Sequence, residues 1–326
     1  MMIVIPDDYQ NVVHTLQCSR HLHAHTVQRY SAPARDPEHM AELLREADVI
    51  VPIRERSRFT RALLERLPRL KLISQTGRST NHIDVKACTE LGIAICAGTH
   101  NSPAAPTELT WALILASRRH IPTEVARMQT DQWPATLAHR LSGSTLGVWG
   151  LGAIGLPVAR IGAAFGMRVL VWGRAQSLER AAIEGFECAR DQSELFERAD
   201  VLTLQMRLTP ETRGIVKRAD LARMKPTALL VNTARAELVE PGALAAGLRD
   251  GRPGFAAVDV YENEPVIGRG EPLLDLPNAI CTHHIAWAEH DNFELYFGEA
   301  FEQIDRYFGG LPVNLVNRDV AGKTRR

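Results

Sequence analysis

The chain has 326 residues, 38 of them basic and 38 acidic, and 45% of the residues are hydrophobic. This length allows two domains with substantial cores, and the balanced charge gives no indication of a nucleic-acid-binding surface. The apolar run 109–117 is too short to span a bilayer, and neither an amino-terminal secretory pattern nor a cysteine framework is visible among the five scattered cysteines. We therefore expect a cytoplasmic α/β protein with reduced thiols, no membrane association and no zinc site.

Residues 1–100 show a repeated strand-then-helix pattern. The predicted strands are 3–6, 26–30, 48–52, 71–75 and 93–96, and the predicted helices are 12–18, 38–46 and 60–67. Such alternation indicates a parallel sheet covered by helices, and so one small domain. This part of the chain carries no phosphate-binding motif of its own.

A long helix is predicted over 102–118, with Pro103 and Pro106 in its first turns. The following segment, 120–144, is less regular and includes Trp133. We interpret this segment as an arm that packs on the partner domain or on another subunit.

The stretch 145–174 predicts a dinucleotide-binding βαβ unit. A strand at 146–149 leads into three glycines in G-x-G-x-x-G spacing, a helix at 154–165 and a second strand at 168–172. The first glycine allows a tight turn, the second lets backbone approach a pyrophosphate, and the third allows close packing of helix on strand. The predicted cofactor contacts in this motif are Gly150, Leu151, Gly152, Ala153, Ile154 and Gly155. The alternative is a structural glycine-rich turn without a ligand.

Six strands are predicted for this second domain. They are 146–149, 168–172, 200–204, 228–232, 255–260 and 279–282. Six parallel strands fit a complete doubly wound fold with the strand order 3-2-1-4-5-6. A final helix at 293–307 is expected to return to the first domain. The expected organisation is therefore a substrate domain at 1–100 and 288–326, with a dinucleotide-binding domain at 101–287 inserted into it.

Candidate catalytic side chains follow the last three strands of this domain. They are Arg235, Glu264 and His284. Ligands of an open parallel sheet bind beyond the carboxyl ends of its strands, so these residues are expected to lie beside the cofactor if strands 1, 4, 5 and 6 are neighbours. Hydride transfer to a 2-oxo acid needs a proton donor, which histidine suits, a carboxylate that orients the imidazole, and a guanidinium for the acid. Thr233 and Asp259 are further predicted cofactor contacts.

The chain resembles the D-isomer-specific 2-hydroxyacid dehydrogenases over nearly its whole length. The residues that carry the resemblance occur in the order typical of the family. They are Thr76-Gly77, Asn81-His82-Ile83-Asp84, Pro106-Thr107-Glu108, the glycine motif, Leu208-Thr209-Pro210-Glu211-Thr212-Arg213-Gly214, and the three segments with the candidate catalytic residues. The resemblance covers both glyoxylate or hydroxypyruvate reductases and phosphoglycerate dehydrogenases. It implies two doubly wound parallel-sheet domains, a Rossmann cofactor domain inserted into a flavodoxin-like substrate domain.

The resemblance also implies roles for individual residues. Arg235 would bind the substrate, and Glu264 would pair with His284. Backbone amides near Gly77, Arg78 and Ser79 would bind the substrate carboxylate. Members of the family are usually homodimers whose active site closes between the two domains.

The chain departs from the family pattern at several of these positions. Ala236 replaces the usual glycine after the arginine, and His283 replaces the usual proline before the histidine. Arg78 and Ser79 replace smaller residues in the substrate loop. Arg78 either favours a substrate with a second anionic group or is a solvated surface arginine. His283 and Glu262 are rivals of His284 and Glu264, and the motif favours the latter pair.

The end of the second strand decides the cofactor preference. An NAD-binding fold usually places Asp or Glu about 20 residues after the glycine motif, whereas Gly173 and Arg174 occupy that place here. Arg174 is able to pair with a 2′-phosphate, so we expect NADP(H), with NAD(H) as the alternative. The expected function is NADP(H)- or NAD(H)-dependent hydride transfer between small 2-oxo and D-2-hydroxy acids. The alternative is a nucleotide-sensing, corepressor-like binding protein of the same fold.

Overall fold

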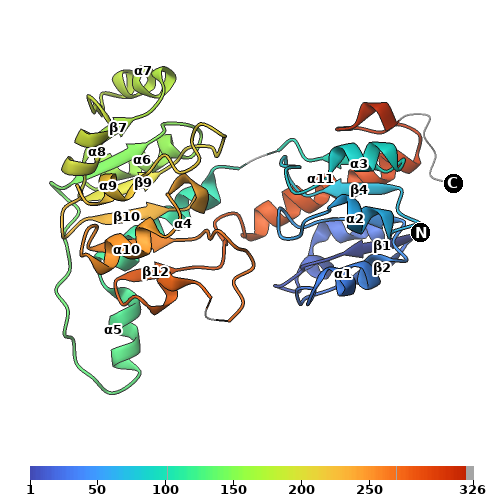
Figure 1. Cartoon of the computed structure of the whole chain (residues 1–326), viewed down its shortest axis with the longest axis horizontal. Helices are drawn as coiled ribbons and strands as arrows, with labels where there is room; N and C mark the ends of the chain where they lie inside the picture. Colours follow the sequence, from blue (N-terminus) through green and yellow to red (C-terminus); the bar gives the residue numbers. More distant parts are fainter. Residues whose placement is uncertain (101, 269, 321–326) are drawn as a thin grey trace. The chain divides into compact units, whose positions relative to one another are not determined.

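The computed structural model describes residues 1–100, 102–268 and 270–320. The chain divides into two compact units, Met1–Ser102 with Ala288–Arg326 and Pro103–Trp287 (Figure 1). Each unit is built on its own parallel sheet, of five strands in the first unit and seven in the second. The expected class, two parallel-sheet α/β domains, is confirmed.

The sheet of the first unit has the strand order β2-β1-β3-β4-β5. Its strands are β1 (Met2–Ile5), β2 (Thr26–Arg29), β3 (Val49–Ile50), β4 (Leu72–Gln75) and β5 (Ala94–Ala97). This order is that of flavodoxin-like folds, in which ligands bind where the strand order reverses. Three helices share one core with the sheet: α1 (Pro37–Leu44), α2 (Arg61–Glu65) and α3 (Val85–Glu90).

Local sequence explains where two of these helices begin. The Asp36 carboxylate accepts a hydrogen bond from the backbone of His39 at 2.7 Å, and Asp84 does the same for Ala87 at 2.8 Å. Each aspartate thus caps one of the amide groups that have no partner inside the helix.

The helix α11 (His290–Phe308) returns to the first unit and packs against β4. Phe293, Phe297 and Phe301 follow one another at four-residue spacing, with ring centroids 5.6 Å apart in each successive pair. The Ser74 hydroxyl donates to the carbonyl of Ala300 at 2.7 Å, which ties the helix to the sheet. One apolar helix face and one buried hydroxyl therefore bring a segment more than 200 residues distant onto β4.

The sheet of the second unit has the strand order β12-β11-β10-β9-β6-β7-β8. Its strands are β6 (Thr145–Trp149), β7 (Arg168–Trp172), β8 (Glu187–Cys188), β9 (Val201–Leu204), β10 (Leu229–Asn232), β11 (Phe255–Val258) and β12 (Ala279–Cys281). The prediction of six strands was wrong, because the two-residue edge strand β8 is too short to show a periodic pattern. With β8 counted as the third strand, the first six strands follow the order 3-2-1-4-5-6, and β12 adds a seventh at the edge.

The strand neighbours also differ from those expected. The last three strands, β10, β11 and β12, lie side by side, but β9 separates β10 from β6. The segments that carry Arg235, Glu264 and His284 therefore leave one end of the sheet together, one strand further from the glycine motif than expected.

Helices cover both faces of this sheet (Figure 1). Leu229 and Val231 belong to one core with α4 (Ala104–Arg118) and α6 (Gly155–Ala164), whereas Leu230 belongs to the core that includes α8 (Gln192–Arg198), α9 (Arg218–Leu221) and α10 (Ala243–Arg249). Alternate residues of a strand point to opposite faces, so an unbroken apolar run is needed where both faces are buried. The helix α7 (Ala175–Glu184) packs on β7 and β8.

The expected helix at 12–18 is replaced by two 3-10 helices, η1 (Val13–Thr15) and η2 (Gln17–Leu22). The Asp8 carboxylate accepts hydrogen bonds from the backbone of Val12 and Val13, and Glu294 of α11 accepts bonds from Gln17 and Cys18. These side chains satisfy amide groups in place of a continuous helical ladder.

The segment 120–144 contains a short helix, α5 (Ile121–Met128), that buries none of its residues within this chain. Ile121 and Val125 are each 49% exposed, and Trp133 and Leu137 are 79% and 91% exposed. The shorter 3-10 helices are η3 (Ala236–Leu238), η4 (Pro272–Asp275) and η5 (Arg318–Val320). Among the helices of the described residues, none combines the length and apolar character needed to cross a bilayer.

Candidate active site

The glycine motif forms the turn between β6 and α6. Gly150 has a φ of +97°, and a Cβ atom there would lie 2.8 Å from the carbonyl oxygen of Gln205. A Cβ on Gly155 would lie 2.1 Å from the carbonyl oxygen of Gly150. Gly152 differs, because a Cβ there would meet no atom within 4 Å. The first and third glycines are thus required by the fold, whereas the second leaves open space beside the amino terminus of α6, where a pyrophosphate fits.

Two side chains of α7 hold the backbone of this turn. The Ser177 hydroxyl accepts a hydrogen bond from the Leu151 amide at 3.1 Å, and the Arg180 guanidinium donates to the Leu151 carbonyl at 3.0 Å. Sequence reasoning missed both residues. Their position in the helix after β7 was visible, but their contact with the turn depends on how that helix packs.

Gly173 and Arg174 follow β7, as expected, and the exposed Arg174 is the residue before α7 begins. The charge of Arg174 reaches Glu211 in the segment after β9. The pKa of Glu211 is lowered, first by a hydrogen bond from the Thr209 side chain and to a lesser extent by Arg174. A cation and a carboxylate therefore both lie near the end of β7.

Arg235 follows β10 in a turn built by Asn232. The Asn232 amide group donates to the carbonyl of Arg235 at 2.8 Å, and its side-chain oxygen accepts from the backbone of Ala234 at 3.1 Å. The Thr233 hydroxyl shares a 2.8 Å hydrogen bond with the hydroxyl of Thr110. These bonds hold the segment between β10 and η3 in a defined conformation.

His284 and Glu264 lie in direct contact. His284 Nδ1 is 2.6 Å from Glu264 Oε2, and the second carboxylate oxygen of Glu264 accepts from the Tyr261 backbone at 2.9 Å. The side chains of His284 and Glu264 are 27% and 30% exposed, so the pair is accessible from solvent. The two residues stand 20 positions apart in the sequence, and the adjacent strands β11 and β12 bring them together.

The backbone at His284 is left-handed, with a φ of +52°. A non-glycine residue pays a steric cost for this conformation, and such residues cluster at functional sites. Buried Asp259 fixes the loop, because its carboxylate accepts hydrogen bonds from Thr282, Ile285 and Ala286 at 2.5, 2.9 and 2.8 Å. Burial raises the pKa of Asp259, and these bonds oppose the increase. In the structure, Asp259 therefore anchors the loop that carries His284.

The rivals of this pair lie in different surroundings. His283 and Glu262 are exposed, and neither has a hydrogen bond or ion pair of its side chain among the described residues. The structure thus brings together Glu264 and His284, the pair that the sequence motif favours.

The predicted substrate loop lies in the first unit, after β4. Gly77 is buried with a φ of +91°, Arg78 is exposed and Ser79 is partly buried. Sequence reasoning missed Arg54, whose guanidinium lies 2.3 Å from the place that a Cβ on Gly77 would take. Arg54 is itself left-handed, and its amide donates to the Thr76 hydroxyl at 2.9 Å. The loops after β3 and β4 thus bring a cation beside Gly77.

Comparison with known proteins agrees with this architecture. The family described as "D-isomer specific 2-hydroxyacid dehydrogenase, NAD binding domain" matches residues 111–286, more than half of the chain. A D-3-phosphoglycerate dehydrogenase of Methanocaldococcus jannaschii is 37% identical over 283 residues, which cover 86% of this chain and 53% of the relative. A glyoxylate reductase of Aeropyrum pernix is 36% identical over 286 residues, with 85% of this chain and 84% of the relative covered.

A crystal structure of a phosphoglycerate oxidoreductase from Vibrio cholerae superimposes with a TM-score of 0.92 and 46% identity, covering 95% of this chain and 99% of that chain. The chain spans about half the length of the phosphoglycerate dehydrogenase but most of the glyoxylate reductase. All three relatives are named as dehydrogenases, reductases or oxidoreductases, and none is named as a corepressor. The chain belongs to the D-isomer specific 2-hydroxyacid dehydrogenases, a family of oxidoreductases with a nicotinamide-nucleotide-binding domain.

Proposed function

We propose that the protein transfers a hydride between NADP(H) or NAD(H) and a small 2-oxo or D-2-hydroxy acid. The observation that carries the proposal is the 2.6 Å contact between His284 Nδ1 and Glu264 Oε2 beside the carboxyl ends of β11 and β12. A bound nicotinamide supplies the hydride in reduction and accepts it in oxidation. The glycine motif, Gly173 and Arg174 are the residues that would hold the nucleotide, with Thr233 as a further contact. Asp259 was expected beside them, but its buried carboxylate would act indirectly, through the loop that carries His284.

His284 is proposed as the proton donor in reduction and the acceptor in oxidation. Glu264 accepts a hydrogen bond from Nδ1–H, which leaves Nε2 of the imidazole for the oxygen of the substrate. The left-handed backbone and the Asp259 anchor restrict the ring to few orientations, as a proton relay requires.

Arg235 is proposed to bind the substrate acid. A guanidinium presents several donors in one plane, so it can bond a carboxylate and a carbonyl oxygen and stabilise the charge that develops on that oxygen. We assign the substrate carboxylate to the backbone amides of the loop of Gly77, Arg78 and Ser79, which turns through a left-handed backbone at Gly77.

The preferred substrates are proposed to carry a second anionic group. The guanidinium of Arg54 lies against Gly77. The exposed Arg78 is the next residue of the loop after Gly77, so two cations stand at this loop. The relatives are named for acids with and without a second anionic group. Phosphoglycerate carries a phosphate in addition to its carboxylate, and glyoxylate carries only a carboxylate.

NADP(H) is proposed as the preferred nucleotide, because the residue after Gly173 is Arg174 and not an aspartate or glutamate. A guanidinium pairs well with a 2′-phosphate. The nearby Glu211 weakens this preference, since a carboxylate repels a phosphate. Arg174→Gln is therefore expected to lower the ratio of NADPH to NADH efficiency, and Glu211→Gln to raise it.

We further propose that the protein is a cytoplasmic homodimer. The arm 120–144 exposes Ile121, Val125, Met128, Trp133 and Leu137, an apolar set that a second copy would cover. The five cysteines are all free thiols, as is usual in a reducing compartment.

The test is an absorbance assay of purified protein with NADPH and NADH in parallel. The panel contains glyoxylate, hydroxypyruvate, pyruvate, phenylpyruvate, 2-oxoisovalerate, oxaloacetate and phosphohydroxypyruvate. His284→Ala should abolish turnover, and the neighbouring His283→Ala should leave most of it as a matched control. Equal turnover by both variants, or no turnover of any acid by protein that binds nucleotide, would contradict the proposal.

A further inference from the structure

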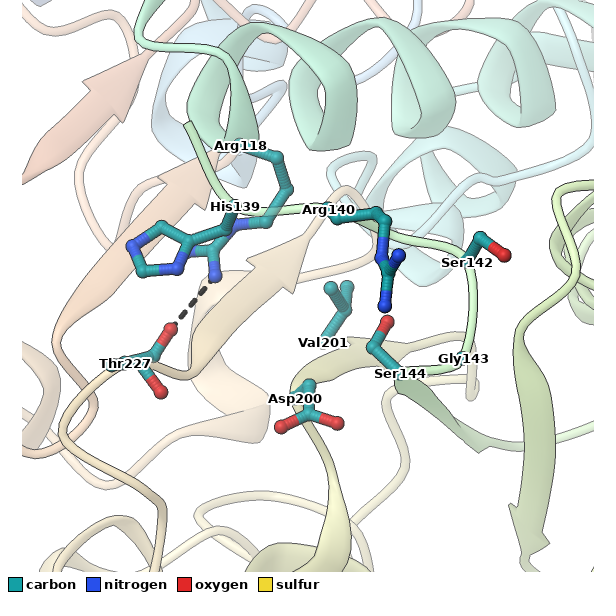
Figure 2. A pocket seen from close by; sticks show the side chains of 9 residues that line it. All are labelled: Arg118, His139, Arg140, Ser142, Gly143, Ser144, Asp200, Val201 and Thr227. Carbon is teal, nitrogen blue, oxygen red and sulfur yellow. Dashed lines mark hydrogen bonds between the residues drawn. The ribbon is translucent and has the colours of Figure 1, made fainter. Parts of the chain in front are cut away.

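A polar pocket of about 310 Å³, whose lining side chains are drawn in Figure 2, lies at the end of the second sheet where β6 and β9 begin. Its walls come from the end of α4, from residues 139–144, and from the residues at which β9 and β10 begin. The segments after β6 and β10, where Gly150 and Arg235 lie, are at the other ends of the same parallel strands. The pocket is therefore separate from the place where nucleotide and substrate are proposed to bind.

The pocket contains a buried cation, Arg118. Its side chain is 3% exposed, one Nη donates to the carbonyl of Thr227 at 2.7 Å, and the guanidinium lies 4.9 Å from the ring centroid of Phe255. Among the described residues, the Nε and the other Nη have no hydrogen-bond partner. Within the described part of the chain, no carboxylate lies within ion-pairing distance of this guanidinium. Burial of a charge without a counterion is costly, so Arg118 makes an anion favourable nearby.

Arg118 remains charged under physiological conditions. Burial lowers its pKa to about 10, and the negative charge of Asp200 opposes this decrease. Burial first, and then Arg118 and His120, lower the pKa of the adjacent His139, so the positive charge of the pocket comes mainly from its arginines.

A second guanidinium, that of Arg140, lines the same pocket and is exposed to solvent. The one acidic side chain among the residues of the wall, Asp200, is already engaged. Its two oxygens accept from the Lys225 ammonium at 2.7 Å and from the Thr145 amide at 2.8 Å. Since Lys225 offsets Asp200, Arg118 and Arg140 leave an excess of two positive charges around the pocket.

We propose that this pocket binds a small oxoanion, a phosphate or carboxylate group of a metabolite. Arg140 would bond the anion directly, as would the exposed hydroxyl of Ser142, which also lines the pocket. Arg118 would attract the anion from the wall, where its field is weakly screened. The Ser144 hydroxyl already donates to the Leu141 carbonyl at 2.5 Å, so it is not a donor for the ligand. A ligand here would stabilise the second unit and leave the nucleotide site open.

The test is calorimetric titration of the full-length protein with inorganic phosphate. Saturating nucleotide, of the form that the turnover assay favours, occupies the phosphate-binding place at the glycine motif, and chloride keeps the ionic strength constant. The loop of Gly77 is also proposed to bind anions, so we expect a saturable phosphate site that the pocket variants below weaken and that Arg78→Gln leaves unchanged. Titration with acetate in a second arm tells whether a carboxylate alone is sufficient.

Variants assign the site to these residues. Arg118→Met and Arg140→Gln should each raise the Kd for phosphate about tenfold or more. Arg140→Gln removes a hydrogen bond between a guanidinium and the anion, and Arg118→Met removes a positive charge that is weakly screened. Arg118→Lys, which keeps the charge, should recover most of the affinity. Arg119→Gln is the matched control, because Arg119 is exposed and is not part of the pocket wall.

Thermal unfolding and turnover verify that each variant is folded. If Arg118→Met does not fold, Arg140→Gln still tests the site, because Arg140 is exposed and its replacement should not disturb the fold. Unchanged affinity in both Arg140→Gln and a folded Arg118 variant would overturn the proposal. Absence of saturable phosphate binding by the wild-type protein with nucleotide bound would overturn it as well.

Discussion

Replacement of Glu264 by glutamine tests the proton relay with a minimal change of shape. Glutamine keeps one oxygen, which the Tyr261 amide needs as an acceptor at 2.9 Å. The amide group then faces His284 Nδ1, where the wild type has a carboxylate oxygen at 2.6 Å. Two donors would face each other if Nδ1 carried a proton, so the variant favours the tautomer with its proton on Nε2.

The size of the effect follows from this contact. A hydrogen bond to a charged group contributes about 1.5–3 kcal/mol, which corresponds to roughly 10- to 150-fold in rate. The side chains are 27% and 30% exposed, so solvent screening favours the lower part of this range. The KM for the acid should change much less, because Glu264 is proposed to act through His284 rather than on the substrate.

The assay is steady-state reduction of the best acid in the panel, with kcat and KM measured separately for each variant. Glu262→Gln is the matched control, since Glu262 stands two residues away, is exposed and should leave kcat within about twofold of the wild type. Glu264→Asp keeps the charge and should restore part of the lost rate. If Glu264→Gln keeps the wild-type kcat, or if Glu262→Gln loses as much activity, the assignment of the pair is refuted.

Three further changes test other parts of the structure. Burial lowers the pKa of His82 from 6.5 to about 4, so the unfolded chain binds a proton that the folded chain does not, and stability is lost as the pH falls. Protonation of His82 in the unfolded chain should lower the free energy of unfolding by about 2 kcal/mol between pH 7 and pH 5. Urea unfolding at the two pH values should show a smaller decrease for His82→Leu than for the wild type. An equal decrease in both proteins would mean that His82 is not the cause. Gly152→Ala should raise the nucleotide Kd without lowering the Tm of the nucleotide-free protein, whereas Gly155→Ala should lower that Tm by several degrees, because only the latter methyl meets backbone. Arg78→Gln should raise the KM for phosphohydroxypyruvate more than the KM for glyoxylate, and an equal effect on both acids would mean that Arg78 is a solvated surface residue.

The sequence alone was sufficient for features that follow from local rules. The glycine spacing in 150–155 predicts a turn, because backbone carbonyl groups leave no room for a side chain at two of the three positions. The apolar runs of β9, β10 and β11 predict strands, and helices cover both faces of the sheet that these strands form. β10, β11 and β12 lie side by side, as the general topology of such folds predicts. The pairing of Glu264 with His284 was expected from the resemblance to the family before any distance was available.

Other features were decided by tertiary contacts. β8 has two residues and exists because it pairs with β7 at the edge of the sheet. The segment after β1 forms 3-10 turns because Asp8 and the distant Glu294 accept its amide hydrogens. Neither feature leaves a periodic pattern from which it could be predicted.

The same distinction holds for the charged residues. Nothing in the residues around Arg54 shows that it lies against Gly77, since that contact joins the ends of β3 and β4. Arg118 looks like an ordinary basic residue at the end of a helix, where it would be expected to reach solvent. Packing against Phe255 and Thr227 buries it instead. A charge acquires its energetic importance from burial and from the distance to its counterions, and both quantities arise only when distant segments pack together.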